Sequence, residues 1–364
     1  MPTHFVDTQA ALGEFLPRWK AAPFLALDTE FIREQTYFPQ LCLIQVGDGQ
    51  DAVCVDPLAG LDLQPLLDVL NAAGSERVFH AAGQDLEIFV RLAGRSPEPL
   101  FDTQVAAGLL GYGEQLGYAG LIDKLIGVKL DKSLSRTDWA RRPLTAPEIA
   151  YAADDVRHLA DVYPRLLREL EERGRLAWLR EDCAAMADPA RYRISPETEW
   201  KRLKGLVRMD AKAQHVAAKL AAWREVLAEQ RDRPRRWILA DEAVYLLAER
   251  RPQTLGQLAD LQALPPKSLE RHGEALVELI TRSAAIDAPP LQVEARSDDA
   301  EKQRIKRLLD RARAIATELG IPSSLLAPRA DVEALAINRE AAQIPLLRGW
   351  RREVAGAELL ALAT

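Results

Sequence analysis

The chain has 364 residues, of which 48% are hydrophobic and 28% are charged, and its formal net charge is −6. This composition is typical of a folded globular protein of two or three domains and excludes a long disordered chain. No apolar run approaches the roughly 18 residues of a membrane span. The first residues lack a basic stretch followed by an apolar one, so we expect neither a membrane anchor nor a signal peptide.

The three cysteines, Cys42, Cys54 and Cys183, are odd in number and scattered, and no Cys-x-x-Cys is present. Their pattern indicates neither a disulfide framework nor a zinc site. We therefore expect a protein of the reducing cytoplasm.

Charge is distributed unevenly along the chain. Residues 1–200 hold 20 Lys and Arg against 31 Asp and Glu, whereas residues 201–364 hold 28 against 23. An acidic first half followed by a basic second half suggests a metal-using catalytic part joined to a part that meets an anion.

Residues 1–190 predict a mixed α/β domain. The first expected helix is capped by Asp7 or Thr8 and runs through Leu16. Strand-like runs follow at 24–31, 41–47 and 52–56, and their short connections predict antiparallel pairing. The remaining expected elements are a helix near 63–70, a strand at 77–81, a helix at 83–90, a strand at 100–101 before a cap at Asp102, and a helix from Thr145 to Leu170 with a capping box.

The second half of the chain is predicted to be helical, and Pro-rich and polar clusters interrupt the helices. A linker is expected near 188–196, followed by a first helical domain at 197–285, a linker at 286–299 and a second helical domain at 300–364. The two helical segments are similar in length and in their helical sequence pattern, which suggests a divergent duplication.

Acidic residues recur at the ends of predicted elements. Asp28 and Glu30 end an apolar strand and, being two residues apart, project from one face of it. Two like charges there are costly unless a cation lies between them, although Asp-x-Glu also occurs at solvated strand ends. Asp85 lies in the first turn of a helix that follows a strand. Tyr151 and Asp155 are four residues apart on the long helix and so share a face.

Taken in order, these residues resemble a known family. Asp28-x-Glu30, Asp85 and Tyr151-x-x-x-Asp155 resemble the three motifs of the tyrosine-bearing branch of the DEDD exonuclease superfamily. The sister branch carries a histidine five residues before the last Asp, and that position is Ala150 here. The segments around the motifs resemble the ribonuclease D family, namely residues 36–45, Phe101–Gln104 and Asp138-Trp139. Residues 200–282 resemble an HRDC domain, and residues 326–329 and 347–354 resemble its divergent second copy.

The resemblance implies a fold and an activity. The fold is an RNase H-like α/β exonuclease domain, a mixed sheet flanked by helices, followed by two all-α HRDC-type domains. The activity is metal-dependent 3′-5′ hydrolysis of RNA that releases nucleoside 5′-monophosphates, as in 3′ maturation of tRNA precursors and other structured RNAs. We expect a monomer that binds RNA and no membrane.

The expected chemistry uses two divalent ions, Mg²⁺ or Mn²⁺, because such a pair activates water and relieves charge at the leaving oxygen. Asp28 would bridge the ions. Glu30 and Asp155 would complete the site of the ion that carries the attacking water, and Asp85 would hold the other, directly or through water. Tyr151 would orient and deprotonate the water, which its ordinary pKa near 10 permits only beside metal ions.

Substrate contacts are predicted from sequence patterns that are less specific than the acidic motifs. The loop at 129–142 is basic and holds one Trp, which suits phosphate contact and base stacking, although an ordinary solvated loop has the same composition. Tyr37 and Phe38 are candidates for stacking on a terminal base, with core packing as the alternative. Residues 201–236 hold 11 Lys and Arg against 4 Asp and Glu, with Trp223 and Trp237 alongside, which favours nucleic-acid binding. The candidates in the loop are Lys132, Arg136, Trp139 and Arg141.

Two other functions are compatible with parts of this pattern. A 3′-5′ DNA exonuclease of the same superfamily shares every catalytic residue, and only the tandem C-terminal modules and the lack of a polymerase domain argue against it. A non-catalytic nucleic-acid-binding scaffold would be expected to have lost a carboxylate, whereas all four are present.

Overall fold

The computed structural model describes residues 1–131, 133–134, 136–292 and 298–363. Contacts among them divide the chain into two compact units that do not follow chain order. Unit 1 contains Met1–Ile32, Leu41–Tyr192 and residues 298–363, whereas unit 2 contains Arg33–Gln40 and residues 193–292. The last helical segment thus groups with the α/β part, and the predicted division into consecutive domains stays a prediction. None of the helices in the described ranges is long and apolar enough to cross a membrane.

Unit 1 is built on a mixed six-stranded sheet in the order β1-β4-β3-β2-β5-β6. The predicted antiparallel pairing is present between β3 and β4, and β2 lies next to β3. The outer pairs β1–β4, β2–β5 and β5–β6 are parallel. The strands are β1 (Thr3–Val6), β2 (Phe24–Ile32), β3 (Gln40–Gly47), β4 (Ala52–Val55), β5 (Glu76–Phe79) and β6 (Leu100–Asp102).

The helices of the α/β part are largely those that the sequence predicts. Thr8 caps the first helix as expected, but the helix continues through Pro17 to Ala21. Asp102 caps the helix after β6 by accepting from the backbone N–H groups of Gln104 and Val105. The helices are α1 (Gln9–Ala21), α2 (Gln64–Leu70), α3 (Gly83–Ala93), α4 (Thr103–Leu109), α5 (Tyr118–Ile126), α6 (Ala146–Glu172) and α7 (Leu176–Ala187).

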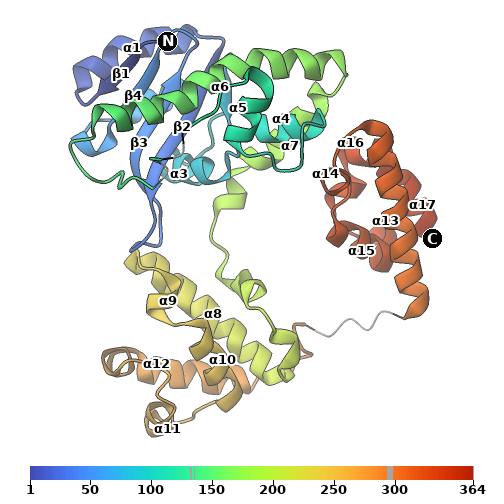
Figure 1. Ribbon diagram of the computed structural model, residues 1–364. Coiled ribbons are helices and arrows are strands. Elements are labelled where there is room, and N and C mark those ends of the chain that lie inside the picture. Colours follow the sequence, from blue (N-terminus) through green and yellow to red (C-terminus); the bar gives the residue numbers. More distant parts are fainter. Residues whose placement is uncertain (132, 135, 293–297, 364) are drawn as a thin grey trace. The chain divides into compact units, whose positions relative to one another are not determined.

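Helix α6 lies against the sheet and contacts β1, β2, β4 and β5 (Figure 1). It begins with the predicted capping box, in which the side chains of Thr145 and Glu148 bond each other's backbone N–H groups. Val156 and Leu159 are buried on its inner face. A side chain at Gly47 would come within 2.9 Å of the Val156 carbonyl oxygen, so glycine there lets the helix approach the sheet closely.

Residues 298–363 form a helical segment that packs on α7 and α4. Its long helix, α13, contacts α15 and α17 (Figure 1). The Trp350 ring stacks on Trp178 of α7, with ring centroids 4.5 Å apart and an interplanar angle of 9°. Asp182 accepts from the Trp350 indole N–H and from the Arg351 guanidinium. The elements are α13 (Asp299–Leu319), α14 (Ser323–Leu326), α15 (Arg329–Asn338), α16 (Gly349–Arg351), a π-helical turn (Arg352–Gly356) and α17 (Ala357–Ala363).

This shared core leads to a prediction for stability. Trp350 is 3% exposed, so Trp350→Ala should lower the free energy of unfolding of unit 1 by about 3–5 kcal/mol, the usual cost of emptying a buried aromatic site. Thermal unfolding followed by circular dichroism measures the loss. Trp237→Ala is the matched control because that ring is 58% exposed, and it should shift the midpoint little. Equal shifts for the two variants would show that residues 298–363 do not stabilise the α/β part.

Unit 2 has a separate core around α8, built from Leu206, Leu220, Leu247, Leu276 and Ile280. Helix α8 packs against α10 and α12. The loop Arg33–Gln40, which connects β2 and β3, belongs to this unit, and the Asp232 carboxylate accepts from the backbone N–H groups of Tyr37 and Phe38. Its helices are α8 (Ala211–Arg231), α9 (Arg235–Ile238), α10 (Asp241–Arg250), α11 (Leu255–Asp260) and α12 (Pro266–Ala284).

Candidate active site

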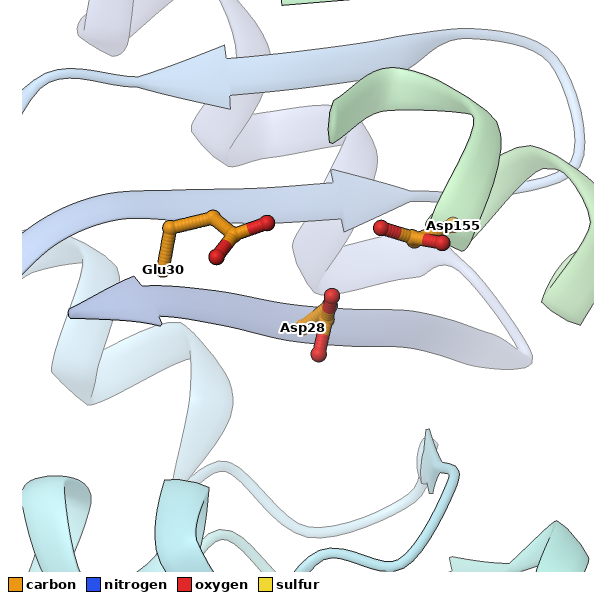
Figure 2. A group of neighbouring side chains, drawn as sticks. All are labelled: Asp28, Glu30 and Asp155. Carbon is orange, nitrogen blue, oxygen red and sulfur yellow. The ribbon is translucent and has the colours of Figure 1, made fainter. Parts of the chain in front are cut away.

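Strand β2 and helix α6 bring three carboxylates together. Asp28 and Glu30 lie two residues apart on β2, and Asp155 projects toward them from α6 (Figure 2). One carboxylate oxygen from each side chain lies within 4.8 Å of the other two. The alternation of side chains along the strand and the position of α6 on the sheet therefore gather residues that lie far apart in the sequence.

Asp85 is not one of these three convergent carboxylates, and it is connected to their strand by a hydrogen bond from Thr29. It lies in the first turn of α3, directly after β5, and is 7% exposed. The Thr29 hydroxyl, on β2 between Asp28 and Glu30, donates a hydrogen bond of 2.5 Å to the Asp85 carboxylate. This contact fixes the Asp85 side chain at the strand that carries the other two acids.

Burial raises the pKa of all four groups, and repulsion among the acids adds to the rise at Asp28 and Glu30. Burial, reinforced by Asp155, Asp85 and Glu30, raises the pKa of Asp28 well above its usual range. Burial raises the pKa of Glu30 to about 8, and nearby Asp155 adds to the rise. Burial likewise raises the pKa of Asp155 to about 7 and that of Asp85 to about 6. The folded protein thus disfavours the ionised forms of these acids unless positive charge is supplied.

These residues fit divalent metal ions. Mg²⁺ and Mn²⁺ prefer oxygen ligands, and Mg²⁺ is typically held by only one or two carboxylates with waters and substrate phosphates completing its shell. Three convergent carboxylate oxygens on a strand and a helix provide such ligands, and a cation would offset the burial and repulsion that raise their pKa values.

Tyr151 is held beside the acids by an aromatic contact. Its ring stacks on Trp139 with centroids 6.3 Å apart and an interplanar angle of 27°. Burial, with smaller effects of Asp155, Glu30 and Asp28, raises the pKa of its hydroxyl above the usual value. The hydroxyl therefore cannot serve as a base near neutral pH unless cations neutralise the carboxylates around it.

A pocket of about 550 Å³ opens beside these groups. Its lining includes residues that the sequence did not single out as functional, above all Tyr118, whose hydroxyl donates to the backbone carbonyl of Asp155. Tyr118 lies at the start of α5, and no acidic or basic residue stands within three positions of it, so no charge pattern marks it. The lining consists of Leu27, Asp28, His80, Gly117, Tyr118, Ala119, Gly120, Leu130, Asp131, Tyr151, Asp154, Asp155 and Leu159.

The predicted substrate-binding loop mostly makes contacts within the protein. Trp139 is 4% exposed and lies against Tyr151, so its ring is not presented for base stacking. Arg141 donates to both oxygens of Glu148, the capping-box residue of α6. Arg136 is exposed, whereas Lys132 lies outside the described residues. The predicted contact of Arg136 with phosphate stays a prediction, and Lys129 is an exposed cation of the same loop.

Tyr37 is packed within the protein, and Phe38 lies half-buried against it. Tyr37 is 4% exposed, its hydroxyl bonds to Glu225, and the Arg235 guanidinium lies 4.7 Å from its ring centroid. The Phe38 ring meets Tyr37 edge-on with centroids 4.8 Å apart. The structure groups both residues with unit 2 and not with the carboxylates, because polar contacts anchor their loop to α8 and α9.

The raised pKa values predict how metal changes stability with pH. Acids whose folded pKa values are raised to about 6, 7 and 8 contribute stability below their unfolded pKa values that is lost as pH rises through this range. The metal-free protein should therefore lose stability on the order of a few kcal/mol between pH 5 and pH 8, since one pKa unit corresponds to about 1.4 kcal/mol. Mg²⁺ should restore the unfolding midpoint more at pH 8 than at pH 5.

Thermal unfolding at both pH values, in EDTA and in Mg²⁺, measures this effect. NaCl at matched ionic strength is the control for screening of surface charge. If NaCl stabilises the protein as much as Mg²⁺ does at pH 8, the carboxylates do not form a divalent-metal site.

Two protein-family models match parts of this chain. A family model described as 3′-5′ exonuclease matches residues 3–171, and the HRDC domain model matches residues 213–280. The predicted second HRDC copy stays a prediction. The chain is 39% identical to ribonuclease D of Zymomonas mobilis, covering 98% of this chain and 93% of that protein. It is 40% identical to ribonuclease D of Nitrobacter hamburgensis, covering 98% of this chain and 94% of that protein.

A solved structure is also similar over the full length. The crystal structure of Escherichia coli RNase D, described as an exoribonuclease involved in structured RNA processing, matches with a TM-score of 0.89 and 30% identity. The match covers 100% of this chain and 98% of that one. Similarity over the whole chain means that the helical segments as well as the α/β part have counterparts in that protein.

Proposed function

Because this chain belongs to the ribonuclease D family of 3′-5′ exoribonucleases, we propose that it removes nucleotides from the 3′ ends of structured RNAs, including tRNA precursors, and releases nucleoside 5′-monophosphates. The description of the Escherichia coli enzyme as an exoribonuclease involved in structured RNA processing supports structured RNA as the substrate. The observation that carries the catalytic proposal is the convergence of Asp28, Glu30 and Asp155, whose carboxylate oxygens lie within 4.8 Å of one another.

The family is metal-dependent, and we propose two divalent ions, Mg²⁺ or Mn²⁺, for this site. When bound, such ions supply an activated water and neutralise charge at the leaving oxygen. Asp28, Glu30 and Asp155 would hold the ion beside the attacking water, with Asp28 shared between both ions. Asp85 would serve the second ion, and its bond from the Thr29 hydroxyl would keep it turned toward β2.

Tyr151 would orient the attacking water and accept its proton. The ring stacks on Trp139, which limits the positions that the hydroxyl can reach. Tyr118 would support the same turn of α6 through its bond to the Asp155 carbonyl. Positioning of this kind lowers the barrier because the nucleophile and its base are already oriented when substrate arrives.

Arg136, with Lys132, is proposed to contact the phosphates of the RNA end because the side chains around them are used within the fold. We further propose a monomeric cytoplasmic protein. The three cysteines are buried and free, as expected for a reducing compartment.

The test is an assay of purified protein on 3′-extended tRNA and on single-stranded DNA of matched sequence, in Mg²⁺, Mn²⁺ or EDTA. Mononucleotides should be released from the RNA in either metal, and EDTA should stop the release. Faster degradation of the DNA would replace this proposal with the DNA-exonuclease alternative. Binding of RNA without cleavage in any metal would favour the scaffold alternative.

A further inference from the structure

Unit 2 contains a second pocket, which does not include any residue of the carboxylate site. It has a volume of about 440 Å³ and lies where the end of α8, helix α9 and the start of α12 meet. The basic and aromatic side chains of its lining are Arg231, Arg233, Lys267, Arg271, His272 and Trp237. Four permanent cations thus line one concave surface, and no Asp or Glu is among the described residues that line it.

These cations differ from other arginines of the same unit. Arg224 pairs with Asp241, Arg235 with Glu225 and Arg251 with Asp210, so each of these has a structural partner. Within the described part of the chain, no carboxylate pairs with the four cations of the pocket. Arg231 instead donates to His272 Nε2 at 3.2 Å, and Arg233 donates to a backbone carbonyl. Unpaired cations gathered in a concavity create a positive potential that attracts anions.

Trp237 adds a feature that a phosphate site alone does not need. Its side chain is 58% exposed and it is not among the residues of the unit's core. The Arg233 guanidinium lies 5.9 Å from its ring centroid, which orients one face of the indole beside the cations. An exposed tryptophan next to phosphate-binding cations is the arrangement on which unpaired bases stack.

Two further observations agree with a positive pocket. Helix α12, which is 19 residues long, begins at Pro266 and places Lys267 in its first turn, where the helix dipole is positive. Burial, together with nearby Arg231 and Arg271, lowers the pKa of His272 below its usual value. The histidine thus experiences the positive potential that an incoming anion would experience.

We propose that this pocket binds an unpaired segment of RNA, holding its phosphates among Arg231, Arg233, Lys267 and Arg271 and stacking one base on Trp237. The inference rests on the proposed function for the identity of the polymer as RNA. A paired segment would not fit the same description, because its bases are already stacked and hydrogen-bonded to each other. The site would therefore hold an unpaired stretch of the substrate through residues other than the carboxylates.

Equilibrium binding of the full-length chain to a fluorescent unpaired oligoribonucleotide tests this site. Anisotropy is measured in EDTA, so that no metal-dependent cleavage interferes, and is repeated over a range of salt concentrations. Trp237→Ala should weaken binding roughly 5- to 100-fold, the usual effect of losing one base–aromatic stack. Trp237→Phe should recover most of the affinity because it keeps a stacking ring. Lys267→Ala with Arg271→Ala should flatten the plot of log affinity against log salt by about 0.7 per lost phosphate contact.

Arg282→Ala is the matched control, because Arg282 is an exposed arginine of α12 that pairs with Glu278 and does not line the pocket. It should leave affinity and salt dependence unchanged. Parental binding by Trp237→Ala, or an equal loss on fully paired RNA, would overturn the proposal. The assay also separates this site from the proposed function. If the parent protein cleaves tRNA in metal and Trp237→Ala binds RNA as tightly as the parent, the pocket proposal alone is contradicted. If Trp237→Ala binds RNA more weakly but the parent protein cleaves no RNA in metal, the proposed activity alone is contradicted.

Discussion

Asp28→Asn is expected to reduce RNA degradation by at least about 10³-fold in Mg²⁺ or Mn²⁺. Asp28 is the acid whose pKa is raised by all three of the others, so it lies at the electrostatic centre of the site. An amide keeps the shape of the side chain but removes the charge that would hold cations, and metal ions contribute several kcal/mol to such reactions. Single-turnover release of mononucleotides from a labelled RNA measures the loss.

The fold should survive this change. Removing one of several repelling buried carboxylates should leave the metal-free protein at least as stable as the parent, while the stabilisation by Mg²⁺ should shrink. Asp161→Asn is the control, because Asp161 is an exposed acid on the same helix as Asp155. Near-parental turnover by Asp28→Asn would contradict a metal site built on this residue.

Part of the candidate site could be predicted from sequence, because residues at fixed spacings along one strand or one helix share a face. Residues two apart on a strand share a face, which places Asp28 and Glu30 together. Residues four apart on a capped helix share a face, which places Tyr151 with Asp155. Helix α6 begins at its predicted capping box, so the positions of Tyr151 and Asp155 along it could be predicted too.

The contacts that the sequence did not predict depend on distant parts of the chain. A basic loop with one tryptophan has the same composition whether it binds RNA or packs, and the position of Tyr151 decides that Trp139 is buried. The loop Arg33–Gln40 meets α8 through Asp232, far away in sequence, and no periodic pattern records such a contact. Likewise, the stacking of Trp350 on Trp178 and the bonds of Asp182 to Trp350 and Arg351 join residues far apart in sequence, and they place the last helices on the α/β part.

Tyr151→Phe is expected to lower the single-turnover rate by about 10²–10⁴, the usual contribution of a positioned general base. The change removes only the hydroxyl and keeps the ring that stacks on Trp139. Titration calorimetry should show metal affinity close to that of the parent, because the hydroxyl is not a proposed ligand. Asp155→Asn, one turn further along α6, should instead weaken both metal binding and turnover.

Tyr118→Phe provides the matched control for loss of a phenol in the same pocket. Its hydroxyl donates to the backbone carbonyl of Asp155, so its removal loosens the helix turn without touching the attacking water. We expect a loss of about tenfold or less, in line with one neutral hydrogen bond of about 0.5–1.5 kcal/mol. Tyr151→Phe should therefore be slower than Tyr118→Phe by at least an order of magnitude. If the two variants are equally active, Tyr151 acts through packing, and the proton of the attacking water must pass to another acceptor.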